Sequence, residues 1–526
     1  MKLAGLNLIG KTTSGKGTVT FKAVNPLTAE ELPTTFREAT EEEVALAVEQ
    51  AESAFLPYRS KPAEERARFL EAIADEILAL GENLIARCME ETALPEARLT
   101  GERGRTTNQL RLFAEVVREG WWADVRIDTA QPDRQPVPRP DIRQMHIPLG
   151  PVGIFGASNF PLAFSVAGGD TASALAAGCP VVVKAHPLHP GTSELVGRAI
   201  LAAAKRTGMP DGVFSLIQGA SNDVGMALVR HPGITAIGFT GSFRGGKALF
   251  DAANQRPVPI PVFAEMGSSN PVFILPGALK ARKEKIAEGL AGSLTLGVGQ
   301  FCTNPGLVVT DGSQDAGHFL ELLGGQVSAL TPGTMLSSGI RNNYLEGMER
   351  MNSAEGVNLI ASSHQAGEEN SVPARVFTAE ADTFFHNPAL EEEVFGPSTL
   401  NISARSKAEL IRVAEALEGH LTATIHGTEE ELQEYASLIA VLERKVGRII
   451  FNGYPTGVEV CHAMMHGGPF PATTAPQTTS VGTAAIRRFA RPVCYQDFPQ
   501  SSLPLPLKDD NPLKIWRLVN GEWTKS

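Results

Sequence analysis

The chain has 526 residues, of which 43% are hydrophobic and 20% are charged, and its formal net charge is −11. A chain of this length exceeds what one hydrophobic core usually supports, so we expect two large domains that are compact throughout. Because the charge is spread without a block of lysines and arginines, we expect neither nucleic acid nor an anionic membrane surface as a partner.

We expect no targeting or membrane segment. The N-terminal stretch is too short and too interrupted to be the apolar part of a signal peptide, and no apolar run is long enough to cross a bilayer. These observations predict a cytoplasmic protein. The cysteines are few, odd in number and widely spaced, which argues against a disulfide framework. They are Cys88, Cys179, Cys302, Cys461 and Cys494.

Two amphipathic helices are predicted within the first hundred residues, after a short β-like start. Thr40 and Glu43 have the spacing of a capping box, and apolar residues recur at helical spacing over Val44–Phe55. Pro62 lies near the start of the second helix, and Gly81 is placed to end it. Each helix has an apolar stripe that must pack on another part of the protein.

The remainder of the chain alternates between short apolar runs and spacers long enough for helices, which predicts α/β structure with parallel sheets. The first region begins at Pro151, and its runs are Val152–Phe155, Val181–Val183, Val213–Ile217 and Ile234–Phe239. A second region begins near Val262 and includes Val272–Leu275, Val308–Thr310, Thr422–Ile425 and Arg448–Phe451. Residues 124–146, rich in proline, lack helical periodicity and predict an excursion from the first region.

Cys302 lies in a stretch of glycine, proline and polar residues, Gly299-Gln-Phe-Cys-Thr-Asn-Pro-Gly306, that is typical of a loop. A thiol there is accessible to substrate and suits a nucleophile, whereas the commoner role of an intracellular cysteine is that of a small buried residue. Glu265 follows an apolar run and precedes a Gly-Ser-Ser turn, where partial burial suits a general base. Its alternative is a solvated residue at a strand end.

Gly241 and Gly246 follow an apolar run at the predicted start of a helix. Backbone N–H groups and the helix dipole attract phosphate at such a place. Their spacing differs from the usual Rossmann G-x-G-x-x-G, and a tight turn alone also requires glycine.

Six motifs occur in the order found in the aldehyde dehydrogenase superfamily, which the chain therefore resembles over nearly its whole length, to about Asn452. They are Gly156-Ala-Ser-Asn-Phe-Pro161, Val183-Lys184, Phe239-Thr-Gly-Ser242, Glu265-Met-Gly267, Gly299-Gln-Phe-Cys302 and Glu392-Glu-Val-Phe-Gly-Pro397. The resemblance implies a Rossmann-like cofactor domain over residues 1–123 and 147–261, and a catalytic domain over 262–468. Residues 124–146 and 469–526 are implied to form a small β oligomerisation excursion and a C-terminal segment.

The same resemblance implies the roles of the site residues. Cys302 is expected to attack an aldehyde and form a thioester, Glu265 to activate water, and the Asn159 amide to bind the oxyanion with the Cys302 backbone N–H. Lys184 and Glu393 are expected to bind the two ribose groups of a nicotinamide cofactor. The other expected cofactor contacts are His186, Gly241, Ser242, Gly246, Gly267 and Phe395.

One departure from the family pattern concerns the cofactor. Members that prefer NAD usually carry Glu three residues after the lysine, where this chain has Pro187. Because a carboxylate there would bind the ribose 2′-OH and repel a 2′-phosphate, its absence predicts NADP with NAD also accepted. His186 and Arg244 are candidates to approach the phosphate.

A second departure, the segment Gly468–Ser480, resembles the branch that contains 2-oxoglutarate semialdehyde dehydrogenases and an NADP-linked fatty aldehyde dehydrogenase. We expect the former activity, with the latter as the alternative. A non-catalytic binding relative would not need Cys302, Glu265 and Asn159 together. A cysteine hydrolase would need a histidine partner for Cys302, and no histidine lies in that loop.

Cys461, His462 and His466 suggest a metal site, but no second ligand pair follows at suitable spacing, so we expect no metal. We expect these residues to line the substrate passage or to pack. By family likeness, residues 124–146 pair with the segment Ala484–Asp497 in a subunit interface, which predicts a homodimer or homotetramer.

Overall fold

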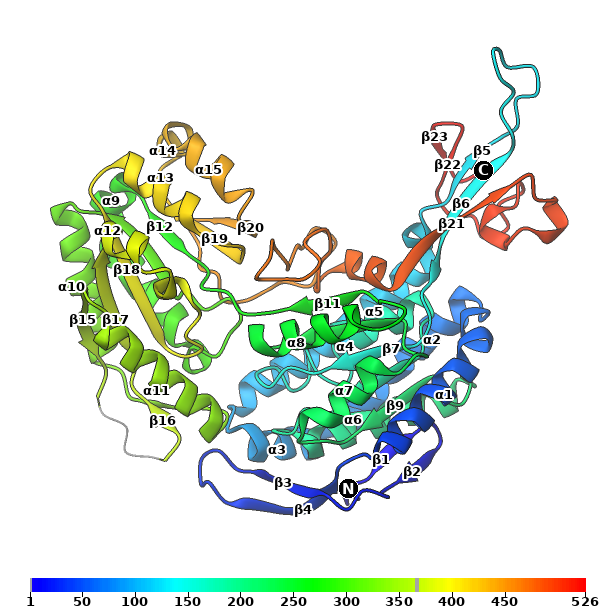
Figure 1. The fold of residues 1–526 in the computed structure, drawn as a ribbon, viewed down its shortest axis with the longest axis horizontal. Coiled ribbons are helices and arrows are strands. Elements are labelled where there is room, and N and C mark those ends of the chain that lie inside the picture. Colours follow the sequence, from blue (N-terminus) through cyan, green and yellow to red (C-terminus); the bar gives the residue numbers. More distant parts are fainter. Residues whose placement is uncertain (1, 365–368) are drawn as a thin grey trace.

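The computed structural model describes residues 2–364 and 369–526. Figure 1 shows a lobe built on each of two large sheets, and an arm that projects from the first lobe and carries the C-terminus. Within the described residues, no helix is both long and apolar enough to cross a membrane.

Four helices precede the central strands of the first sheet: α1 (Glu41–Arg59), α2 (Ala63–Ala79), α3 (Gly81–Thr92) and α4 (Glu96–Glu119). The predicted capping box is confirmed. The Thr40 hydroxyl accepts a hydrogen bond from the Glu43 N–H at 3.2 Å, and the Glu43 carboxylate accepts one from the Thr40 N–H at 2.9 Å. The second predicted helix is also confirmed, because α2 begins directly after Pro62 and ends before Gly81.

The first large sheet has the strand order β11-β10-β7-β8-β9-β1-β2, and its strands from β11 to β9 are parallel. All four predicted runs of the first region form strands here. The strands are β1 (Asn7–Ile9), β2 (Thr12–Ser14), β7 (Val152–Phe155), β8 (Val181–Lys184), β9 (Phe214–Ile217), β10 (Ala236–Thr240) and β11 (Val262–Glu265). The helices between them are α5 (Gly169–Ala177), α6 (Pro190–Arg206), α7 (Asn222–Arg230) and α8 (Phe243–Asn254).

The strand β11 corrects one expectation. We predicted that the second alternating region begins near Val262, but β11 pairs in parallel with β10, from Ile237 opposite Val262 to Thr240 opposite Glu265. A single apolar run indicates a strand without indicating its sheet, because the partner is chosen by tertiary packing. The pairing places Glu265 at the carboxyl end of the first sheet.

The second large sheet has the order β15-β17-β18-β13-β12-β19-β20, and only β15 runs antiparallel to its neighbour. The four runs predicted after Val262 form β12, β13, β19 and β20. The strands are β12 (Val272–Ile274), β13 (Leu307–Asp311), β15 (Val357–Ser362), β17 (Arg375–Glu380), β18 (Ser398–Ala404), β19 (His420–His426) and β20 (Val446–Phe451). The helices are α9 (Pro276–Thr295), α10 (Gln314–Ser328), α11 (Ser338–Ser353), α12 (Ala381–His386), α13 (Lys407–Ala416), α14 (Glu429–Glu434) and α15 (Ala436–Leu442).

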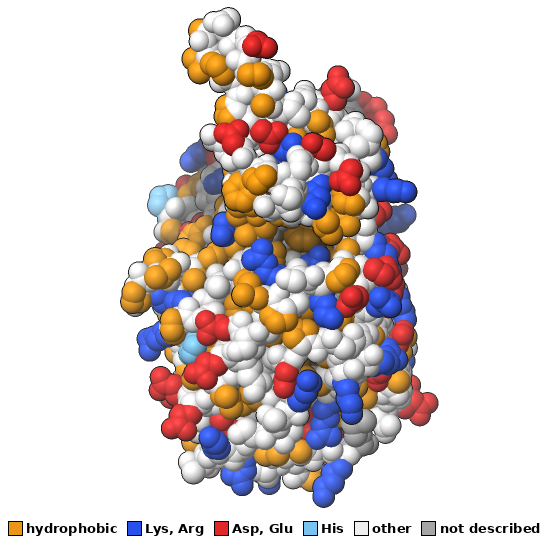
Figure 2. Space-filling view, turned by 90° about the vertical axis from the view of Figure 1, so that its right-hand side faces the viewer, with side chains coloured by type: hydrophobic (Ala, Val, Ile, Leu, Met, Phe, Trp, Pro, Cys, Tyr) orange, Lys and Arg blue, Asp and Glu red, His pale blue; other side chains and the backbone are white. Residues whose placement is uncertain are grey.

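The arm is a sheet of order β21-β6-β5-β22-β23, with β5 (Arg126–Asp128), β6 (Ile142–Pro148), β21 (Ala490–Gln496), β22 (Arg517–Val519) and β23 (Glu522–Thr524). The predicted pairing of residues 124–146 with the segment near Ala484–Asp497 is confirmed within one chain, because β6 and β21 are antiparallel partners. Figure 2 shows the arm projecting from the top of the molecule, with hydrophobic side chains gathered in the hollow below it. Its role in a subunit interface stays a prediction, as does the division into domains.

Short elements complete the chain. They are β3 (Thr20–Val24) paired with β4 (Glu31–Arg37), β14 (Gly333–Thr334) paired with β16 (Ser371–Val372), and the 3-10 helices η1 (Trp121–Ala123), η2 (Leu296–Gly299), η3 (Pro388–Glu391), η4 (Thr483–Phe489), η5 (Gln500–Ser502) and η6 (Leu505–Leu507).

Candidate active site

A cavity of about 450 Å³ lies between the two lobes, where the chain leaves β7, β8, β10 and β11. Parallel sheets bind ligands outside the carboxyl ends of their strands, and this volume suits a small-molecule site. Every predicted site residue except Gly246 lines it. These residues are Asn159, Lys184, His186, Gly241, Ser242, Glu265, Gly267, Cys302, Glu393 and Phe395.

The loop that carries Cys302 is held in one conformation by its neighbours. Gly299 has φ +64°, and a Cβ on it would lie 2.3 Å from the backbone carbon of Gly396, so only glycine fits there. The amide Nδ2 of Asn270 donates hydrogen bonds to the carbonyls of Cys302, at 2.8 Å, and Asn304, at 2.9 Å. Asn270 was not among the predicted site residues, although it closely follows the Glu265 motif.

His466 lies against both chemical groups of the site. Its Nε2 is 3.5 Å from the sulfur of Cys302 and 2.8 Å from Oε1 of Glu265. Glu265 is buried, with 3% of its surface exposed, and the Ser480 hydroxyl donates to its Oε2. Among the described residues no donor is aligned for a hydrogen bond on Oε1 of Glu265. A carboxylate oxygen has two lone pairs, so Oε1 keeps acceptor capacity beside the His466 contact.

Burial and neighbouring groups shift the pKa values of Cys302 and Glu265 in opposite directions. Burial raises the pKa of the Cys302 thiol well above its ordinary value, and the carboxylates of Glu265 and Glu393 raise it further. Burial also acts to raise the pKa of Glu265, but His466, Ser480 and Cys302 together lower it below its usual value. At neutral pH the resting site therefore holds a neutral thiol beside an ionised carboxylate.

His462 and His466, which lie close together in the sequence, have different surroundings in the structure. His466 points into the site, whereas His462 has its Nδ1 3.3 Å from the Thr483 hydroxyl. Ligand atoms of Glu265, Cys302 and His466 lie within 4.8 Å of one another, which is also a spacing that a metal ion can bridge. We expected these histidines to line the substrate passage or to pack. The sequence indicates no chemistry for His466, because its nearness to Cys302 depends on the fold.

Asn159 is positioned to present an amide donor. Its Nδ2 donates one hydrogen bond to the carbonyl of Gln300 at 2.9 Å, and its backbone carbonyl accepts one from Arg98 at 2.7 Å. Because an amide nitrogen carries two hydrogens, one N–H remains for a ligand in the cavity. The side chain is buried and shares the cavity lining with Cys302.

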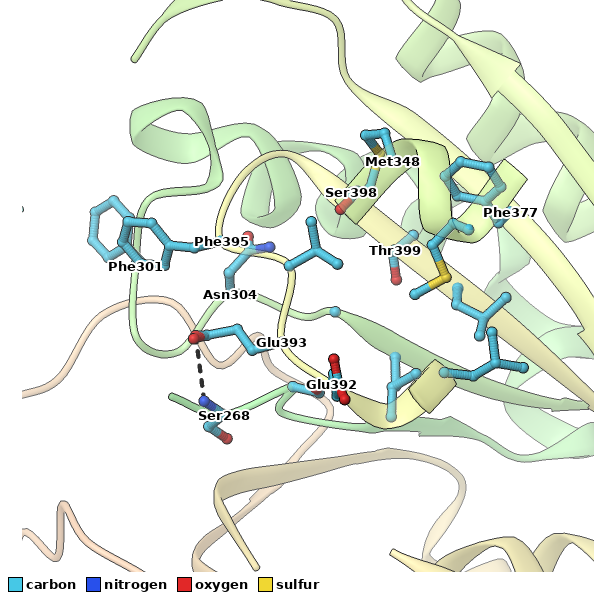
Figure 3. Close-up of a pocket in the computed structure, with 17 residues that line it drawn as sticks. Ser268, Phe301, Asn304, Met348, Phe377, Glu392, Glu393, Phe395, Ser398 and Thr399 are labelled. Carbon is cyan, nitrogen blue, oxygen red and sulfur yellow. Dashed lines mark hydrogen bonds between the residues drawn. The ribbon is translucent and has the colours of Figure 1, made fainter. Parts of the chain in front are cut away.

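The second lobe contributes Glu393 and Phe395 to the cavity. Figure 3 shows both residues in a second, smaller pocket that they also line, with the hydrogen bond from Ser268 to Glu393. The Glu393 carboxylate accepts a hydrogen bond from the Ser268 N–H at 3.3 Å, and burial raises its pKa to about 7. A Cβ at position 267 would lie 2.3 Å from Oε2 of Glu393, so Gly267 makes room for this carboxylate. The Glu393 carboxylate has further acceptor positions, which suit a hydroxyl donor such as that of a ribose.

The strand ends of the first lobe contribute Lys184 and His186. Burial lowers the pKa of Lys184 to about 8. Burial, His189 and Lys184 lower the pKa of His186 well below its usual range, so its ring is neutral, and its Nδ1 accepts a hydrogen bond from the Leu188 N–H at 3.2 Å. His186 therefore brings no positive charge to the cavity. Arg244 is exposed and is not among the residues of the lining.

The start of α8 faces the same cavity. The Ser242 hydroxyl caps the helix by accepting from the Gly245 N–H at 3.2 Å, and Gly245 lines the cavity together with Gly241. Gly246 instead packs under Met266, where a Cβ would lie 2.7 Å from the sulfur. The helix terminus, Lys184 and Glu393 form a set of donors and acceptors that fits a dinucleotide along the cavity towards Cys302.

Known proteins of similar sequence and fold identify the family of this chain. Residues 12–469 match the model of the Aldehyde dehydrogenase family. The chain is 54% identical over 524 residues to alpha-ketoglutaric semialdehyde dehydrogenase 2 of Azospirillum brasilense, covering 99% of this chain and 100% of that protein. It is 49% identical over 492 residues to alpha-ketoglutaric semialdehyde dehydrogenase of Acinetobacter baylyi, covering 93% of each. The NAD+ complex of an aldehyde dehydrogenase from Bacillus cereus has the same fold, with a TM-score of 0.79 at 24% identity over 93% of this chain and 96% of that one.

Proposed function

The chain belongs to the aldehyde dehydrogenase family, and from this premise we propose that it oxidises 2-oxoglutarate semialdehyde to 2-oxoglutarate. The protein is an oxidoreductase that acts on an aldehyde with a nicotinamide cofactor. The observation that supports this substrate is that two relatives, which match nearly the whole chain, are named for this aldehyde.

The first half of the proposed reaction depends on removing the proton of the Cys302 thiol. We assign this step to His466, whose Nε2 lies 3.5 Å from the sulfur, with the negative charge of Glu265 stabilising the imidazolium. The thiolate then attacks the aldehyde carbon, and a C–S bond forms. The free N–H of Asn159 and the backbone N–H of Cys302 are proposed to stabilise the oxyanion.

The nicotinamide cofactor, when bound, supplies the acceptor for the hydride of the former aldehyde carbon. The acyl group then remains on Cys302 as a thioester. Glu265 is proposed to accept a proton from the attacking water at Oε1, where the described residues offer no aligned donor. Breaking the C–S bond releases the acid, which ionises to the carboxylate, and returns Cys302 to the thiolate. The thiolate takes back one of the two protons held by the His466–Glu265 pair, and the other proton is released to solvent.

We propose NADP as the preferred cofactor, with NAD also accepted. Pro187 lines the cavity at the position where a carboxylate would repel the 2′-phosphate, and Lys184 is the adjacent cation. The neutral state of His186 supports Lys184, and not His186, as the group that offsets the phosphate charge. A ratio of kcat/KM for NADP to that for NAD above one is the expected result, and a ratio well below one would contradict the assignment.

The proposed assembly is a cytoplasmic homodimer or homotetramer formed through the arm. Two tryptophans on or beside the last hairpin are exposed, Trp516 at 48% and Trp523 at 60%, which is unusual for large apolar side chains unless a partner covers them. Light scattering is expected to give a mass of at least two chains, and replacement of Trp523 by Ser to reduce it.

The test of the proposed function is a substrate panel. The purified protein is assayed with 2-oxoglutarate semialdehyde, pentanal and a long-chain fatty aldehyde, with formation of reduced cofactor measured by absorbance. We expect the highest kcat/KM for the semialdehyde, and no turnover of any aldehyde by Cys302→Ala. A higher kcat/KM for the long-chain aldehyde would instead support the fatty aldehyde alternative.

A further inference from the structure

A second cavity, of about 620 Å³, lies between one face of α4 and residues 458–460. On α4 its lining residues recur every three or four positions, as expected for one helix face. These are Arg105, Asn108, Arg111, Leu112 and Glu115. Of these residues, Arg105 is the one that links the cavity to Cys302.

Arg105 is linked to Cys302 through two rings. Its guanidinium carbon lies 5.0 Å from the centre of the Phe164 ring, and that ring lies 6.4 Å from the ring of His466. His466 in turn contacts the Cys302 sulfur at 3.5 Å. Burial lowers the pKa of Arg105, and the carboxylates of Glu102 and Glu265 oppose this shift. A substrate whose carboxylate is at Arg105 and whose aldehyde is at Cys302 must therefore extend past the Phe164 and His466 rings.

Among the described arginines near the Cys302 loop, Arg105 has two buried guanidinium nitrogens without an acceptor, whereas Arg448 has only one, its Nε. Arg98 donates to the carbonyl of Asn159 at 2.7 Å, and Arg448 donates to the carbonyls of Pro455 and Gly457 at 2.9 and 3.2 Å. The guanidinium groups of Arg98 and Arg448 thus donate hydrogen bonds to backbone carbonyls. By contrast, Nε and Nη2 of Arg105 are buried, and the described part of the chain offers them no hydrogen-bond acceptor.

A buried guanidinium with free N–H groups is costly unless a ligand satisfies them. Arginine remains charged at neutral pH, and its planar fork matches a carboxylate bidentately. Glu115 and Glu459 also line the second cavity, so its overall charge does not attract an anion. The specific feature is the unpaired guanidinium of Arg105, which Phe164 and His466 separate from Cys302.

We propose that Arg105 determines specificity by binding the carboxylate of a short 2-oxo acid substrate whose aldehyde carbon lies at Cys302. This inference rests on the proposed function and adds the residue that recognises the acid end of the substrate. A neutral aldehyde of the same chain length has no carboxylate for Arg105 to bind. The contribution of Arg105 is therefore selective for one class of substrate.

The experiment compares 2-oxoglutarate semialdehyde with pentanal in the full-length enzyme and in the variants Arg105→Gln and Arg105→Lys. Arg105→Gln is expected to lower kcat/KM for the semialdehyde by about tenfold to a hundredfold, chiefly through KM, and to change that for pentanal by less than about threefold. Arg105→Lys keeps the charge without the fork, so we expect an intermediate loss. The matched control is Arg103→Gln on the same helix, whose side chain donates to the Gly81 carbonyl outside the cavity lining, and it should keep the substrate preference.

A second measurement needs no turnover. The product 2-oxoglutarate is expected to slow alkylation of Cys302 by iodoacetamide in the unmodified protein and to protect Arg105→Gln at least about tenfold less well. An equal loss on both aldehydes, or unchanged protection, would overturn the inference and assign Arg105 a packing role against Phe164. If the unmodified enzyme does not prefer the semialdehyde over pentanal, the proposed function itself fails. If it does and Arg105→Gln keeps that preference, only the role of Arg105 fails.

Discussion

The imidazole Nε2 of His466 lies 2.8 Å from Oε1 of Glu265, in a buried site where the sulfur of Cys302 lies 3.5 Å from the same nitrogen. This one nitrogen is thus close to the Cys302 thiol, which must lose a proton first, and to the Glu265 carboxylate, which must accept a proton later. Thioester formation and hydrolysis are therefore expected to be coupled through this pair.

Replacing His466 by Gln is expected to slow thioester formation, because the acceptor for the thiol proton is lost. General-base contributions of this kind are about 10²- to 10⁴-fold in rate. Stopped-flow measurement of the first turnover should show a slower burst of reduced cofactor. His462→Gln is the control from the same segment, since His462 contacts Thr483 instead, and it should retain the burst rate. Equal effects of the two substitutions would contradict the role of His466.

Replacing Glu265 by Gln is expected to separate the two halves of the reaction. A burst of reduced cofactor should remain, because Cys302 and His466 are intact, although its rate should fall because the charge that stabilises the imidazolium is lost. Steady-state kcat should fall further, by about a hundredfold or more, because water has lost its base. Mass spectrometry of the mixed enzyme should detect the acyl group on Cys302. Loss of the burst with unchanged steady-state turnover would exclude this assignment.

The reactivity of Cys302 is expected to rise with pH into the alkaline range, because its pKa lies well above the usual value and only the thiolate reacts. Glu265→Gln removes a negative charge that raises this pKa, so the profile of iodoacetamide alkylation should shift to lower pH. The exposed Cys494 in the same sample is an internal control for the reagent. A shift to higher pH in the variant would show that Glu265 assists ionisation of the thiol.

Asn159→Ala is expected to lower kcat by about 10² to 10³, the usual cost of one lost oxyanion donor. It should also reduce the free energy of unfolding by about 1 kcal/mol, because the hydrogen bond to the Gln300 carbonyl is lost. Urea unfolding and steady-state kinetics measure the two effects separately. A normal kcat in the variant would exclude the amide from the oxyanion site.

Gly299→Ala should destabilise the protein and inactivate it, since its Cβ would lie 2.3 Å from the backbone of Gly396 in a left-handed turn. We expect a loss of about 2 kcal/mol or more in the free energy of unfolding. The matched control is Gly292→Ala within α9, where a Cβ meets nothing within 4 Å and a gain of about 0.5 to 1 kcal/mol is expected. Similar unfolding midpoints for the two variants would contradict the steric argument.

The motifs around Asn159, Glu265 and Cys302 were sufficient to identify these residues as a group, and the structure brings all three to one cavity. His466 was considered only as a candidate ligand or packing residue, because the sequence offers no histidine near Cys302. Gly246 had a motif position but lies against Met266, since glycine spacing does not distinguish phosphate contact from close packing. The strand β11 was placed in the wrong region for a similar reason, because one apolar run fits either sheet.

The sequence by itself determined the α/β class, most strands of both sheets and the family to which the chain belongs, because these depend on local periodicity and on residues at fixed spacing. Only the tertiary structure decided that His466 lies against both Cys302 and Glu265, and that two buried nitrogens of Arg105 have no acceptor among the described residues. These relationships join residues far apart along the chain. Their distances arise from the packing of the two lobes around one cavity, which no local pattern encodes.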